Sequence, residues 1–123
     1  MMIDRQKVLD KYNGHCAYCG CEITQKTMQV DHIKNQHGFW IGKKGYQVHK
    51  GIKDDTDING IDNLNPACAV CNKWKSTFSI EDFRYEISEQ INRAEKTSAN
   101  FRMAKRYGLI QVLDKPIKFY FEP

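Results

Sequence analysis

Residues 63–75 read NLNPACAVCNKWK, and their pattern sets the interpretation of the whole sequence. They contain two cysteines with a two-residue spacer, Cys68 and Cys71. A spacer of that length lets both sulfurs of a pair reach one metal ion. A second pair with the same spacer, Cys16 and Cys19, lies near the N-terminus. Because Zn²⁺ takes four thiolates tetrahedrally, the two pairs predict a closed, structural zinc site with no open position for a substrate.

Residues 20–67 separate the two cysteine pairs, a longer segment than the roughly 15–20 residues of a plain zinc ribbon. A sizeable structure is therefore expected between the pairs. Iron in an electron carrier is the main alternative to zinc, because tetrahedral all-sulfur coordination suits both metals. His15 and Cys21 flank the first pair and are weaker ligand candidates, and Cys21 is interpreted as a free thiol or a small core residue.

The composition is that of a small domain that benefits from a metal site. The chain has 123 residues, 28% of them charged, and a mean hydropathy of −0.66, so a small apolar core is expected. A structural zinc ion contributes roughly 10 kcal/mol of apparent binding free energy, which would offset that small core. The odd number of cysteines argues against a disulfide framework, and the net charge of +4 fits a polyanionic partner.

The sequence contains no apolar run of the 18 or so residues that a membrane helix needs. Its N-terminus has charged residues where a signal peptide would be apolar. We therefore expect a cytoplasmic protein without a membrane partner.

Periodicity and capping residues predict an α+β fold in one domain over residues 1–123. The first helix is expected over 4–13, with Asp4 as its N-cap and Gly14 at its end. The other expected elements are a strand over 28–33, a long loop over 34–60, a helix over 69–77, a helix over about 79–96, a short helix over 98–107 ended by Gly108, and an edge strand over 117–121.

Polar residues with catalytic chemistry lie between and just after the cysteine pairs: Asp31, His32, Asn63, Asn72 and Lys75. With the cysteines, their order resembles the HNH endonucleases, the ββα-metal or His-Me finger family. The resemblance covers residues 14–77, and residues 63–75 are its most specific part. It implies a ββα-metal core over about 14–77 stapled by the four-cysteine zinc site, with C-terminal helices over about 78–123. It also implies metal-dependent hydrolysis of DNA phosphodiester bonds.

Within this resemblance, each polar residue has an expected role. His32 would be the general base, because a neutral imidazole can take a proton from water near neutral pH. Asp31 and Asn72 would hold Mg²⁺ or Mn²⁺, since such a hard cation prefers oxygen ligands. The cation would act as a Lewis acid on the phosphate and the leaving oxygen. Asn63 would orient the loop that carries the histidine, and Lys75 would contact a phosphate.

Two features differ from the common family pattern. Position 72 is often histidine in the family, although asparagine keeps an oxygen ligand there. The segment between His32 and Asn63 is longer than is common, and the extra residues, around Gly38 to Asp57, would touch DNA or cover the site. Neighbouring strand residues also point to opposite faces, so Asp31 and His32 can serve one site only if the strand ends or twists there.

Positive side chains for backbone phosphates are expected on two helices: Lys73, Lys75, Arg102, Lys105 and Arg106. An ordinary solvated face is the alternative interpretation of the last three. The apolar stripe of Ile80, Phe83, Ile87 and Ile91 is expected to be core or a homodimer face. A non-catalytic zinc module that binds nucleic acid or protein is the alternative function. A short chain of this kind weakly favours a phage or mobile-element origin.

Overall fold

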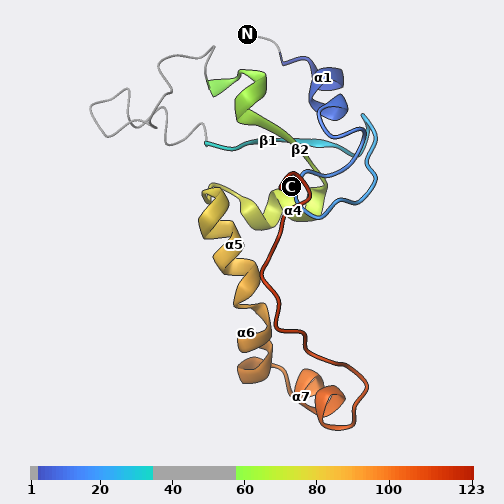
Figure 1. The fold of residues 1–123 in the computed structure, drawn as a ribbon, viewed down its shortest axis with the longest axis vertical. Helices are drawn as coiled ribbons and strands as arrows, with labels where there is room; N and C mark the ends of the chain where they lie inside the picture. The colour runs from blue at the N-terminus through green and yellow to red at the C-terminus, as the bar shows by residue number, and fades with distance from the viewer. Residues whose placement is uncertain (1–2, 35–57) are drawn as a thin grey trace, which may run out of the picture. The chain divides into compact units, whose positions relative to one another are not determined.

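The computed structural model describes residues 3–34 and 58–123, which divide into two compact units. Figure 1 shows their helices and strands. The first unit runs to Ile80 and includes Phe119–Pro123, and the second unit is Glu81–Lys118. Mixed helix and strand confirm the α+β fold class. The expected boundaries, a core over about 14–77 and an extension over about 78–123, stay a prediction.

The N-terminal helix α1 (Arg5–Asp10) has the predicted N-cap, since Asp4 Oδ1 accepts hydrogen bonds from the backbone of Gln6 and Lys7. Gly14 follows the helix with φ +79°, the left-handed conformation expected of it. The helix buries two apolar residues in the core of the first unit. That core contains Val8, Leu9, Ile23, Met28 and Leu64.

In the described part of the first unit, two antiparallel strands form a sheet, and a helix directly follows the second of them. Strand β1 (Gln29–His32) pairs with β2 (Leu64–Ala67), with Asp31 opposite Asn65 and His32 opposite Leu64. The 3-10 helix η1 (Ile61–Asn63) precedes β2, and α4 (Ala69–Lys75) follows it and packs against β1. This strand–strand–helix order confirms the ββα core. The sequence does not predict strand β2, because Asn65 and Pro66 both disfavour strands.

The prediction of an edge strand over residues 117–121 is wrong. Residues 110–119 have no regular secondary structure, and the chain turns at Tyr120 and Phe121. The turn is closed by a hydrogen bond from Glu122 N to Phe119 O. The tail nevertheless bonds to the first cysteine pair, because the backbones of Tyr120 and Phe121 donate to the carbonyls of Tyr18 and Ala17.

The second unit contains three helices: α5 (Ile80–Ser88), α6 (Gln90–Thr97) and α7 (Ala99–Arg106). The first residue of α5, Ile80, is counted with the first unit. One continuous helix was expected over 79–96, but it is interrupted at Glu89. The Ser88 hydroxyl donates to Tyr85 O, a local side-chain bond that competes with the helix backbone. Ser98 caps α7 by accepting from Phe101 N, and Gly108, with φ +72°, ends it as predicted.

The apolar stripe of the second unit is only partly buried: Phe83 is 1% exposed, whereas Ile91 is 41% exposed. A homodimer through this stripe stays a prediction. In the described residues, no helix combines the length and apolar composition that a membrane span requires. Residues 35–57 of the expected loop, with the extra segment from Gly38 to Asp57, lie outside the described residues.

Candidate functional site

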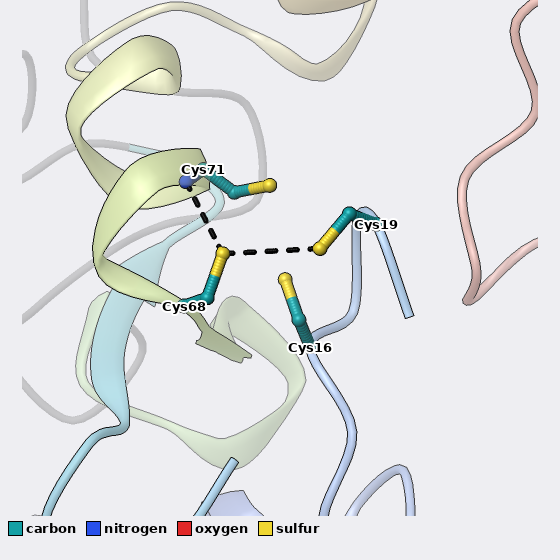
Figure 2. Close-up of side chains that lie close together, drawn as sticks. All are labelled: Cys16, Cys19, Cys68 and Cys71. Atoms are coloured by element: carbon teal, nitrogen blue, oxygen red, sulfur yellow. Dashed lines mark hydrogen bonds between the residues drawn. The ribbon is translucent and has the colours of Figure 1, made fainter. Parts of the chain in front are cut away.

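The two cysteine pairs meet in the first unit, as predicted. The Sγ atoms of Cys16, Cys19, Cys68 and Cys71 all lie within 4.8 Å of one another. Figure 2 shows their sulfurs gathered, with one pair on the N-terminal turn and the other at the start of α4. Cys68 is the N-cap of α4, and its sulfur accepts from Cys71 N at 3.3 Å. These four residues are called the cysteine centre below.

The geometry of the cysteine centre fits a tetrahedral thiolate site. Zn–S bonds of about 2.3 Å give sulfur–sulfur edges of about 3.8 Å in a tetrahedron. Cys19 Sγ and Cys68 Sγ are 3.8 Å apart. A hydrogen bond from the Cys71 thiol, together with hydrogen bonds from backbone N–H groups, lowers the pKa of Cys16 to about 4. The same bond raises the pKa of Cys71, as does burial.

Neither weaker ligand candidate belongs to this group of sulfurs. The described group of close metal-binding side chains holds the four cysteines and excludes His15 and Cys21. His15 Nδ1 lies 3.1 Å from the Asn13 carbonyl, a bond in which the ring nitrogen donates. Cys21 is exposed, and desolvation, together with bonds to Cys19 and Cys68, raises its pKa to about 12.

Asp31 lies on β1 with a side chain only 3% exposed, and each of its oxygens has its own donor. Lys75 Nζ, from α4, lies 3.1 Å from Oδ1. The Tyr18 hydroxyl donates a short hydrogen bond to Oδ2. Burial raises the pKa of Asp31, an effect that Lys75 and Tyr18 oppose. Burial also raises the pKa of Tyr18, so its hydroxyl keeps the proton that it donates.

His32, the next residue on β1, points to a different set of partners. Its Nε2 lies 2.9 Å from Asn59 Oδ1, and because an amide oxygen only accepts, Nε2 carries the proton. The backbone carbonyl of His32 accepts from Lys75 Nζ at 3.2 Å. The side chains of Asp31 and His32 therefore have different partners, although the ammonium of Lys75 contacts both residues. Strand β1 ends at His32, which meets the condition under which the two can serve one site.

Asn63 joins the two described ends of the long loop. Its Oδ1 accepts from Lys34 N at 2.9 Å, and its Nδ2 donates to Ile58 O at 2.8 Å and to Lys34 O at 3.1 Å. Its own carbonyl accepts from Ile33 N. These bonds fix the backbone that directly follows His32, the geometry that an orienting role requires.

The remaining predicted residues of this region lie on α4. Asn72 is half-buried and Lys73 is exposed. Asn72 precedes Lys75 by three residues, so both lie on the same helical face. In the described residues, the side chain of Asn72 makes no hydrogen bond to Asp31 or His32, so only its place on α4 beside Lys75 relates it to them. Lys75 itself is fully buried, so a contact with phosphate would require it to leave Asp31.

The three basic residues of α7 belong to the second unit, whereas the cysteine centre and the Asp31 region belong to the first. The side chains of Arg102 and Lys105 both contact Glu95 of α6: Arg102 donates to its carbonyl oxygen at 2.8 Å, and Lys105 pairs with its carboxylate. Arg106 is exposed. The helix and the common face of these residues are as expected, and a DNA contact through them stays a prediction.

The structure adds three residues with contacts in this region that the sequence pattern does not identify: Tyr18, Asn59 and Asn65. Asn65 Nδ2 donates to the Tyr18 hydroxyl at 3.2 Å. The sequence does contain a sign for Asn65: it lies within residues 63–75, close to a predicted site residue, and a buried asparagine needs hydrogen-bond partners. Tyr18, between two cysteines, and Asn59, at the loop end, had no such signal.

Comparisons with known proteins found similarity to a curated sequence and to solved structures. The chain is 35% identical, over 91 residues, to the SPbeta prophage-derived putative HNH endonuclease YoqL of Bacillus subtilis strain 168. The match covers 74% of this chain and 35% of that protein, so the chain spans about a third of its relative. The crystal structure of the Type II-C Cas9 enzyme from Actinomyces naeslundii aligns with a TM-score of 0.47 and 23% identity, over 83% of this chain and 10% of that one. No family model matches.

Proposed function

Since this chain belongs with the HNH endonucleases, by its sequence and by the ββα order of its core, we propose that it is a metal-dependent endonuclease that hydrolyses DNA phosphodiester bonds. The observation that carries the proposal is the pair Asp31–His32 on β1, held by one ammonium from the helix that follows β2. A carboxylate and an imidazole at the same strand end supply a cation ligand and a base.

His32 is the proposed general base, acting through Nδ1. Its Nε2 donates to Asn59, so in the neutral ring the lone pair lies on Nδ1. Nδ1 would take the proton of the attacking water. Asn59 would hold the ring in this tautomer, while Asn63 fixes the backbone on the C-terminal side of the histidine.

Asp31 and Asn72 are the proposed ligands of a catalytic divalent cation. A carboxylate has about four acceptor positions, of which Lys75 and Tyr18 fill two, and an amide adds a further hard oxygen. Mg²⁺ or Mn²⁺ bound there would neutralise charge on the phosphate and stabilise the departing oxygen. Asn72 lies on the helical face that carries Lys75, which supports its share in this set.

Zinc is the proposed ion of the cysteine centre, where its role would be structural because all four positions are thiolates. DNA is the proposed partner, and we expect the protein to act in the cytoplasm. The exposed cations of the two helices, Lys73, Arg102, Lys105 and Arg106, are proposed to contact backbone phosphates. The prophage origin of the relative supports a phage context.

Cleavage of supercoiled plasmid with Mg²⁺ or Mn²⁺ tests the proposal. The wild-type protein is expected to nick or cut, and His32→Ala to lose about 10²-fold or more of the rate, as removal of a general base does. His15→Ala, which also removes an imidazole from the first unit, is the control and should keep the rate. Equal cleavage by wild type and His32→Ala would contradict the assigned base. DNA binding without any cleavage would favour the non-catalytic zinc module.

A further inference from the structure

The two oxygens of the Asp31 carboxylate are held by side chains from the two cysteine pairs. Tyr18, which bonds to Oδ2, lies between Cys16 and Cys19. Lys75, which bonds to Oδ1, ends the helix that begins at the second pair. Each half of the cysteine centre therefore sends one donor to the same carboxylate, although the chain separates these donors widely.

Tyr18 is fixed on every side. Its ring is 3% exposed and meets Phe119 and Phe121 edge-on, with centroids 5.4 and 6.0 Å away. Its hydroxyl receives the Asn65 amide at 3.2 Å, and Asn65 is the register partner of Asp31 in the sheet. With the amide donating to it, the hydroxyl oxygen is occupied as an acceptor and its proton is directed at Asp31.

A carboxylate with separate donors on its two oxygens cannot turn about its Cβ–Cγ bond without losing one of them. The same Lys75 ammonium also donates to the backbone carbonyl of His32. One group thus orients both the side chain of the proposed cation ligand and the backbone of the proposed base. Well-packed apolar side chains often stabilise a fold as much as a buried ion pair does, so the stability of the sheet does not by itself account for these polar groups. Their arrangement is instead that of outer partners which orient a metal ligand.

We propose that Tyr18 is a positioning residue for Asp31: its hydroxyl, held by Asn65, orients the carboxylate opposite Lys75 and thereby couples the cysteine centre to the catalytic cation. This inference rests on the proposed function. It assigns Lys75 to the same positioning role, in place of a contact with phosphate.

Tyr18→Phe tests the proposal, since it keeps the ring between Phe119 and Phe121 and removes only the hydroxyl. Outer partners of metal ligands typically change affinity or activity by about 10–100-fold. We expect kcat for DNA cleavage to fall at least 10-fold with KM for DNA unchanged. We also expect the Kd for Mn²⁺, measured by titration calorimetry on the zinc-loaded protein, to rise by about 10-fold. Tyr120→Phe removes the hydroxyl of a half-exposed tyrosine whose backbone bonds to Tyr18, and it should leave both values unchanged.

Each outcome of the experiment decides the proposal. Wild-type kcat and Mn²⁺ affinity in Tyr18→Phe would overturn it. Failure of Tyr18→Phe to fold or to bind one zinc per chain would also overturn it, because Tyr18 would then be a structural residue. If the wild-type protein cleaves no DNA, the proposed function fails, whereas the Mn²⁺ titration still shows whether Tyr18 positions Asp31.

Discussion

An ion pair in each unit shows how differently the two are built. In the first unit, Lys75 and Asp31 are 44 residues apart, and their side chains are 0% and 3% exposed. In the second unit, Lys105 and Glu95 are 10 residues apart, and their side chains are 49% and 33% exposed. The buried pair depends on long-range folding, whereas the exposed pair links neighbouring helices and is screened by solvent.

The difference indicates where changes to the sequence should be felt. The first unit has a buried core, the cysteine centre and every residue of the proposed active site. The second unit buries no side chain in α6 or α7. Chemistry that needs fixed geometry is therefore expected from the first unit, and contacts that only need charge are expected from the second.

The largest effect is expected from removal of the metal proposed for the cysteine centre, by a strong chelator or by Cys68→Ser. Structural zinc contributes on the order of 10 kcal/mol, comparable to the whole stability of a small domain, so the first unit should unfold. Hydrogen exchange should show loss of protection in β1, β2 and α4. The amides of α6 and α7 should exchange fast with or without metal. Metal-dependent protection in α7 would mean that the two units fold as one.

The next effect in size is expected from Lys75→Met, which leaves the Asp31 carboxylate buried without its cation. Breaking a buried pair in this way costs about 3–5 kcal/mol, which urea denaturation should show as a lower free energy of unfolding. Lys73→Met, at an exposed position two residues earlier, should change it by less than about 0.5 kcal/mol. The double variant Asp31→Leu with Lys75→Met should regain most of the loss. Equal effects of the two single variants would contradict the buried ion pair.

A smaller effect is expected from glycine substitutions that have the same backbone strain in different surroundings. Gly20 and Gly108 have φ of +81° and +72°. A Cβ on Gly20 would lie 2.8 Å from the Tyr120 ring, whereas a Cβ on Gly108 would meet nothing within 4 Å. Gly20→Ala should lower the stability of the first unit by about 2 kcal/mol, from left-handed strain plus displacement of that ring. Gly108→Ala should leave the urea midpoint of the first unit unchanged, and a matching loss would contradict independent units.

The same contrast explains which features could be predicted from the sequence. The cysteine pairs, the Asp4 cap and the Gly108 stop depend on residues close together in the chain, so their local pattern was enough. Strand β2 forms only because β1 pairs with it, against the preference of Asn65 and Pro66. The partners of Asp31 also come from distant segments. Nothing in the neighbouring sequence indicates that a tyrosine between two cysteines, or a lysine at a helix end, will be buried and will donate a hydrogen bond to a carboxylate.

The smallest effect is expected from Arg106→Gln on α7, and it concerns DNA affinity rather than stability. Each phosphate contact releases condensed counterions, and the slope of log K against log salt is negative. Loss of one contact should make that slope less steep by about 0.9 and weaken binding equally for all DNA sequences. Arg106 suits this test better than Lys105 or Arg102, whose side chains contact Glu95. Binding titrations by fluorescence anisotropy at several salt concentrations would measure the slope. Lys96→Gln changes an exposed lysine of α6 and is the control. If the salt slopes of Arg106→Gln and Lys96→Gln change equally, the second unit supplies only general positive charge and α7 makes no defined phosphate contact.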